Sequence, residues 1–182
     1  MTTALAGAIE LLERSLGYTR VALAGVTDAR LAAPTPCRDW TLRDLLAHMD
    51  DALDAFTEAA GGNVALTRTP SAPAVMVLQQ KACTLMGLWS DLAPPGIRVG
   101  EVDLATDLLV TTAALEITVH GWDVAQATGE GTPIPDELAW DLLPVAHRTV
   151  AEGDRGIRFA DALPEPVGAT SDVRLRAFLG RP

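Results

Sequence analysis

The chain has 182 residues, of which 48% are hydrophobic and 21% charged, and its formal net charge is −10. This balance is typical of a soluble globular protein, and the length favours one domain over residues 1–182 with a core that needs no disulfides. The acidic excess argues against binding to nucleic acid or to an anionic membrane, because phosphate groups are bound by clustered Lys and Arg.

Cysteine content and hydropathy indicate the cellular compartment of the protein. Cys37 and Cys83 are too few to form a disulfide framework. The first residues lack the basic start and uninterrupted apolar run of a signal peptide, and no stretch of about 18 apolar residues is present. We therefore expect a cytoplasmic protein that does not enter the membrane.

Apolar periodicity predicts four long helices in the first 128 residues. The first covers residues 3–30. The second begins after Thr41, because a Thr followed three positions later by Asp44 is typical of a capped helix start, and it stops at residues 61–62, both Gly. The third begins near Pro73 and ends before residues 94–96. The fourth covers residues 102–128 and closes on Gly129.

The last third of the chain is predicted to be less regular. A fifth helix is expected over residues 136–151, kinked or divided at Pro144. Residues 152–182 are rich in Gly and Pro, with one short helix at 172–179. No strand-like alternation of useful length is seen. The predicted fold is all-α, a four-helix bundle with an appended C-terminal helix and an irregular tail, in which the loops 61–72 and 92–101 leave room for crossovers.

Three polar residues in apolar helical stretches are candidates for one site. Glu116 and His120 lie four residues apart, so both side chains leave the same helical face. His48 lies in the predicted second helix. If the three converge, they form a three-ligand metal site with an open position, as in catalytic zinc centres; nickel, iron and cobalt accept the same donors. The alternative is a set of hydrogen-bonded polar side chains inside the bundle.

Two segments resemble the signatures of a known family. Residues 36–49 (PCRDWTLRDLLAHM) and residues 116–125 (EITVHGWDVA) resemble the two motifs of the mycothiol-dependent maleylpyruvate isomerase N-terminal domain family. That family belongs to the DinB/YfiT-like metalloenzymes, which are four-helix bundles with a divalent metal. Residues 178–182 are similar to the ending of its single-domain members.

The resemblance implies a ligand set and a chemistry. The family's metal ligands correspond to His48, Glu116 and His120, with zinc as the first expectation and nickel as the second. It also implies mycothiol or a similar low-molecular-weight thiol as cosubstrate. The thiolate would attack a small electrophilic substrate in a transferase or isomerase reaction. The chain lacks the second domain of the full isomerase, so the resemblance does not carry over maleylpyruvate as substrate.

Two other functions are consistent with the same residues. One is a metal-dependent hydrolase or Lewis-acid biosynthetic enzyme that uses no thiol. The other is a non-catalytic protein that binds a metal or a small molecule. Either a monomer or a homodimer is expected.

The remaining polar candidates have competing explanations. Asp123 follows His120 by three residues and could orient its imidazole, or it could be a surface carboxylate. Cys37 could be activated by the helix that follows it, but a structural role is favoured. Asp44 is explained by helix capping, and His147 by an ordinary, partly exposed position. The tryptophans flanking the motifs are expected to pack in the core or line a pocket, namely Trp40 and Trp122.

Overall fold

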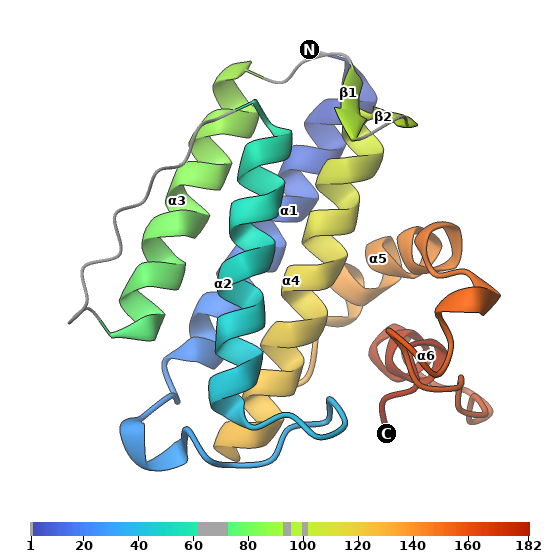
Figure 1. The fold of residues 1–182 in the computed structure, drawn as a ribbon. Helices are drawn as coiled ribbons and strands as arrows, with labels where there is room; N and C mark the ends of the chain where they lie inside the picture. Colours follow the sequence, from blue (N-terminus) through green and yellow to red (C-terminus); the bar gives the residue numbers. More distant parts are fainter. Residues whose placement is uncertain (1, 62–72, 93–95, 100–101) are drawn as a thin grey trace.

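Four long helices pack side by side and enclose the core. A computed structural model describes residues 2–61, 73–92, 96–99 and 102–182. Contacts between α1 and α4, α4 and α2, α2 and α3, and α3 and α1 close a ring of four helices (Figure 1). The helices are α1 (Thr3–Leu23), α2 (Leu42–Ala59), α3 (Ala74–Leu92) and α4 (Thr106–Thr128). The predicted all-α fold is confirmed.

The core is built from apolar side chains that recur at helical spacing on each of these elements. Leu12 of α1, Leu45 of α2, Leu85 of α3 and Val110 of α4 are all fully buried. Trp89 of α3 is also fully buried. The apolar faces that the sequence periodicity predicts are therefore the faces that pack together inside the bundle.

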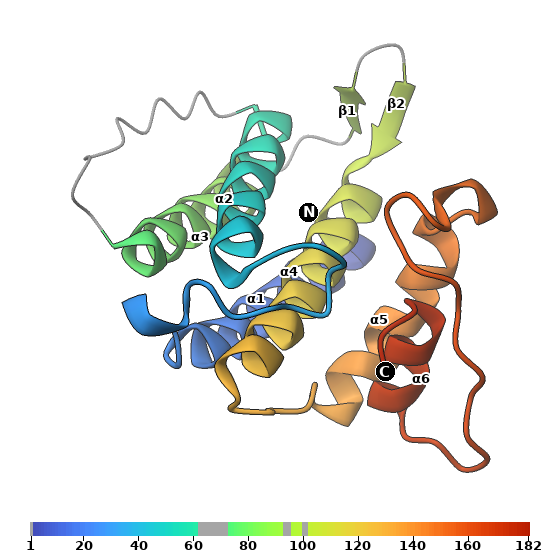
Figure 2. The same ribbon diagram turned by 60° about the horizontal axis from the view of Figure 1, so that its bottom comes forward.

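The two C-terminal helices lie beside the bundle. These are α5 (Asp136–Thr149) and α6 (Ser171–Phe178), and α5 contacts α4, α1 and α6. Figure 2 shows both on the α4 side of the bundle, away from α2 and α3. The appended helix and the short last helix were both predicted. Pro144 lies inside α5, but the helix continues through it as one element, so the predicted division does not occur.

The end of the first helix differs from the prediction. The first helix ends at Leu23, and a short 3₁₀ turn at Asp28–Arg30 replaces its predicted last residues. The chain turns at Gly25, where an added Cβ would lie 2.9 Å from the Glu130 side chain. The connection therefore passes too close to the end of α4 for a helix with side chains to continue.

A small hairpin precedes α4 and was not predicted. Strands β1 (Gly96–Val99) and β2 (Val102–Ala105) pair in antiparallel register, and α4 consequently begins at Thr106 rather than at residue 102. Each strand has only four residues, too few for a clear period-two pattern. The predicted loop 61–72 lies outside the described residues, apart from Gly61.

The start of α2 forms as predicted and positions one candidate ligand. The Asp44 backbone N–H donates to Thr41 Oγ1 at 3.4 Å, and the Thr41 N–H donates to Asp44 Oδ2 at 2.9 Å. This reciprocal capping box fixes the first turn of α2, which carries His48 on its second turn. No helix in the described ranges is long and apolar enough to cross a membrane.

Candidate metal centre

Two histidines converge on one carboxylate at the α2–α4 contact. His48 Nε2 lies 2.8 Å from Glu116 Oε1, and His120 Nε2 lies 3.1 Å from the same oxygen. One donor atom from each of the three residues lies within 4.8 Å of the others. The structure thus brings together the three residues singled out from the sequence, although His48 and Glu116 are 68 positions apart.

The cluster opens onto a cavity of about 670 Å³ between the bundle helices. Glu116, Ile117 and His120 of α4 form part of its wall. The rest comes from α1, α2 and α3 and is mostly apolar, with Leu16, Leu53 and Leu78 among the lining residues. A pocket of this size can hold a small organic molecule next to the donor atoms.

Asp123 holds His120 from the other side of its ring. The side chain of Asp123 is completely buried, and its Oδ2 lies 3.0 Å from His120 Nδ1. The Nδ1–H donates to this carboxylate, which directs Nε2 toward the cluster, where it could bind a metal once its own proton is displaced. Of the two interpretations left open for Asp123, a buried orienting position fits the structure and a surface carboxylate does not.

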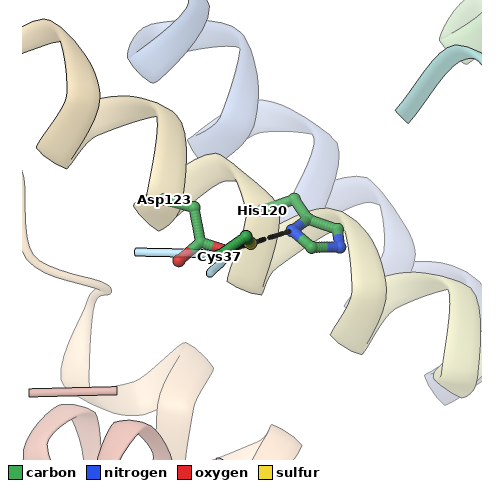
Figure 3. Close-up of side chains that lie close together, drawn as sticks. All are labelled: Cys37, His120 and Asp123. Atoms are coloured by element: carbon green, nitrogen blue, oxygen red, sulfur yellow. Dashed lines mark hydrogen bonds and ion pairs between the residues drawn. The ribbon is translucent and has the colours of Figure 1, made fainter. Parts of the chain in front are cut away.

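Asp123 is in turn bound by the C-terminal tail. Arg181 donates from Nε to Asp123 Oδ1 at 2.8 Å and from Nη2 to Oδ2 at 2.7 Å, a bidentate pair. Cys37 donates from Sγ to Asp123 Oδ2 at 3.3 Å, and Figure 3 shows its sulfur beside His120 Nδ1, at 3.9 Å. The connected groups are therefore His120, Asp123, Cys37 and Arg181.

The Cys37, His120 and Asp123 group also has the donor types of a metal site. Its position is already held by a cation, because Arg181 Nη2 lies 3.7 Å from Cys37 Sγ and 2.7 Å from Asp123 Oδ2. A divalent ion there would have to displace the guanidinium. Among the described residues no such cation lies against the His48, Glu116 and His120 group, which makes it the better candidate for a metal centre.

Charge compensation shifts the ionisation of the site. Burial by itself would raise the pKa of Glu116, but hydrogen bonds from His120 and His48 hold it well below its ordinary value. Burial would likewise lower the pKa of His120, yet its bonds with Asp123, Cys37 and Glu116 raise it. Burial also opposes ionisation of Asp123, and Arg181 with His120 brings its pKa down to about 2. The site is therefore a network of ionised, mutually compensated groups.

An aromatic side chain covers the imidazoles. The Trp40 ring lies 4.9 Å from the His48 ring and 6.5 Å from the His120 ring. Trp40 comes from the turn before α2, where Asp39 adopts a left-handed φ of 65° that short polar residues tolerate. Trp40 thus lines the site, whereas Trp122 packs in the core, beneath the Arg176 guanidinium.

The structure leaves the other candidates outside the centre. Asp44 caps α2, and the His147 ring lies against Phe178, 4.1 Å away. Cys83 lines the cavity from α3. Arg181 was not identified from the sequence as a site residue; the only signal was that residues 178–182 are similar to a family's typical ending.

Comparison with known proteins supports the relationship suggested by the motifs. The profile described as the mycothiol maleylpyruvate isomerase N-terminal domain matches residues 12–98. Two relatives from Mycobacterium tuberculosis are each 31% identical over 174 residues, covering 87% of this chain and 89% of the relative. They are "uncharacterized protein Rv0738" of strain H37Rv and its counterpart in strain CDC 1551 / Oshkosh. The chain belongs to the mycothiol maleylpyruvate isomerase N-terminal domain family.

Membership in this family associates the chain with mycothiol-related proteins. The profile match includes all of α2 with His48, and it ends before Glu116 and His120 on α4. No solved structure matches the chain. The contact between His48 of α2 and Glu116 of α4 is therefore seen only in this structure and not in the family profile.

Proposed function

We propose that the protein is a divalent-metal-dependent enzyme of the thiol S-transferase or isomerase type. Its cosubstrate is mycothiol or a similar low-molecular-weight thiol, and its substrate is a small electrophile. Membership in a mycothiol-associated family supports the thiol, and the cavity beside the donor atoms supports a small-molecule substrate.

The convergence of His48, Glu116 and His120 carries this proposal. Two imidazole nitrogens lie within 3.1 Å of one carboxylate oxygen, an arrangement compact enough for a single ion with bonds of about 2.0–2.2 Å. Neutral imidazole and carboxylate donors fit zinc, and nickel as the alternative. Three protein ligands leave a coordination position for an exogenous group.

The chain's own residues prepare the site for that chemistry. A divalent ion held there supplies a positive charge that favours the thiolate form of a bound thiol at neutral pH. Asp123 fixes the ring of His120 and its tautomer, and Arg181 keeps Asp123 ionised. Trp40 packs over both imidazoles and reduces their contact with water. The apolar cavity wall holds the electrophile next to Glu116 and His120.

Metal analysis and calorimetry test the proposal. We expect the purified protein to hold one zinc or nickel ion per chain, and the metal-loaded protein to bind mycothiol with a measurable heat. The His48→Ala variant should bind neither the metal nor mycothiol, so the heat of mycothiol binding should disappear together with the bound metal. The matched control, His147→Ala, changes a histidine of α5 that does not belong to the cluster and should retain both.

Two results would overturn the proposal in different directions. Metal-loaded protein that binds no thiol, and that turns over a substrate from an electrophile or ester panel equally well without thiol, would favour the hydrolase or Lewis-acid function. Substoichiometric metal that added zinc or nickel does not restore would favour the non-catalytic binding protein.

A further inference from the structure

The cavity beside the metal centre contains one uncompensated charge. Its charged lining residues are Glu116 and Arg20. Glu116 is paired with the two imidazoles that contact it, at 2.8 Å from His48 Nε2 and 3.1 Å from His120 Nε2. Arg20, on α1, has no hydrogen bond or ion pair to any described residue. Arg20 is the one arginine among the described residues that line the cavity.

The rest of the cavity wall is mostly apolar, with Thr19 and Gln79 as polar members. Its aliphatic and thioether side chains come from α1, α2, α3 and α4, and are Leu16, Leu23, Met49, Leu53, Leu78, Met86 and Ile117. Arg20 itself is exposed, so its guanidinium lies where the cavity meets solvent. The imidazole of His120 is only 8% exposed and lies at the buried part of the wall. The cavity wall is therefore mostly apolar, with the exposed cation Arg20 on α1 and the buried His120 on α4.

We propose that this cavity binds an apolar organic acid. The carboxylate of the ligand pairs with Arg20, and its apolar body lies along the cavity toward Glu116 and His120. A guanidinium binds a carboxylate through two parallel N–H donors, one to each oxygen. An uncharged alcohol with the same alkyl chain has a single oxygen and cannot accept both hydrogen bonds in this geometry. That this acid is the electrophilic substrate rests on the proposed function; that it binds does not.

Calorimetric titration with decanoate and decanol tests the inference on the protein as purified. We expect decanoate to bind more tightly than decanol. Arg20→Gln should weaken decanoate binding about fivefold, as expected for a partly exposed charge pair, and leave decanol binding unchanged. The control Arg43→Gln removes an exposed arginine of α2 that does not line the cavity and should change neither affinity.

A second variant and a spectroscopic readout locate the ligand. Ala82→Phe narrows the cavity from α3 and should weaken both ligands, while the imidazole NMR resonances of His120 should shift when decanoate binds to the unaltered protein. Equal affinity for decanoate and decanol, or an Arg20→Gln variant that binds decanoate normally, would overturn the carboxylate assignment. No binding of either ligand would overturn the inference entirely, and thiol binding by the metal-loaded protein would still stand on its own.

Discussion

Asp123 connects three other side chains at the site. Its carboxylate is completely buried, yet it contacts the His120 imidazole, the Cys37 thiol and the Arg181 guanidinium. A buried carboxylate is costly unless its charge is compensated, and here the compensation comes from the C-terminal tail. Arg181 thereby connects the end of the chain to a proposed metal ligand.

Asp123→Asn should reduce metal affinity without removing a ligand. The amide can present its NH₂ group to His120 Nδ1, which favours the wrong tautomer and turns the Nε2 lone pair away from the metal. We expect zinc affinity to fall by about 10- to 100-fold, measured by competition with a chromophoric chelator. Asp141→Asn, at an exposed pair with Arg14, is the control and should bind zinc normally. Unchanged affinity in Asp123→Asn would show that the ring is held by other contacts.

Arg181→Gln should destabilise the folded protein because it removes the bidentate guanidinium partner of the buried Asp123 carboxylate. Loss of one partner of a buried pair costs about 3–5 kcal/mol. Urea denaturation of the metal-free protein measures this free energy. The control Arg174→Gln breaks an exposed pair with Glu165 and should cost less than about 1 kcal/mol. Equal effects of the two substitutions would contradict the structural role of Arg181.

At the scale of elements, α1 and α4 pack closely together beside the site. Gly121 follows His120, and a Cβ at this position would lie 2.4 Å from Thr19 Oγ1 and 3.1 Å from the Thr19 Cα. Thr19 Oγ1 donates to the Ile117 carbonyl at 2.8 Å, so the two helices are joined where α4 carries Glu116 and His120. The absence of a side chain at Gly121 thus sets the position of the ligand-bearing turn.

Gly121→Ala should therefore push α1 and α4 apart, despite the better helix propensity of alanine. Overpacking of this kind costs about 1–3 kcal/mol, and the same shift should weaken zinc binding. Thermal unfolding with and without zinc measures both effects. Gly7→Ala adds the same methyl group to α1 where no atom lies within 4 Å, and it should stabilise by roughly 0.5–1 kcal/mol. If Gly121→Ala behaves like Gly7→Ala, the close approach does not constrain the helices.

The sequence predicted those elements whose signals are local. The capping box at Thr41 and Asp44 needs only a three-residue spacing, and the long helices need only their own apolar stripes. The early end of α1 was missed because it depends on a contact between Gly25 and Glu130, more than a hundred residues away. The hairpin before α4 was missed because four-residue strands carry too little pattern.

The site residues also fall into those that local spacing predicts and those that depend on contacts between distant parts of the chain. Glu116 and His120 share a face by helical geometry alone, so their pairing could be predicted from spacing. His48 was a candidate from its apolar helical setting, and the resemblance then placed it in the same ligand set. The contact of Arg181 with Asp123 spans 58 positions and is made by an irregular tail, for which no periodicity rule exists. That Asp123 is buried also follows from the packing of this tail and could not be decided from the sequence.

At the scale of the whole molecule, an acidic chain with a single lysine and a single tyrosine keeps both of them inside. Lys81 of α3 forms ion pairs with Asp50 and Asp54 of α2, each at 2.7 Å. Burial would lower the pKa of Lys81, but these carboxylates raise it. The Tyr18 hydroxyl donates to the Thr132 carbonyl at 2.9 Å, and burial, with acidic neighbours, raises its pKa far above 10.

Both shifts make stability fall at alkaline pH. In the unfolded chain Tyr18 and Lys81 release their protons near pH 10 to 10.5, whereas the folded protein retains both. Below about pH 9 both states hold these protons, so the two groups do not change the free energy of unfolding with pH. At higher pH the unfolded state binds fewer protons than the folded state. Above about pH 10 the free energy of unfolding decreases, by up to about 1.4 kcal/mol per pH unit for each group.

Urea denaturation from about pH 8 to about pH 11 should reveal this decrease in the free energy of unfolding. A substitution at Tyr18 should show how much of the decrease comes from Tyr18 and how much from Lys81. Tyr18→Phe removes one titrating group and should make the alkaline slope shallower, although it also loses the hydrogen bond to Thr132. Because Tyr18 is the only tyrosine, tyrosinate absorbance reports its ionisation directly and should appear together with loss of helical circular dichroism. Tyrosinate forming near pH 10 while the helices remain intact would show that Tyr18 is accessible to water and would remove it as a cause of alkaline unfolding.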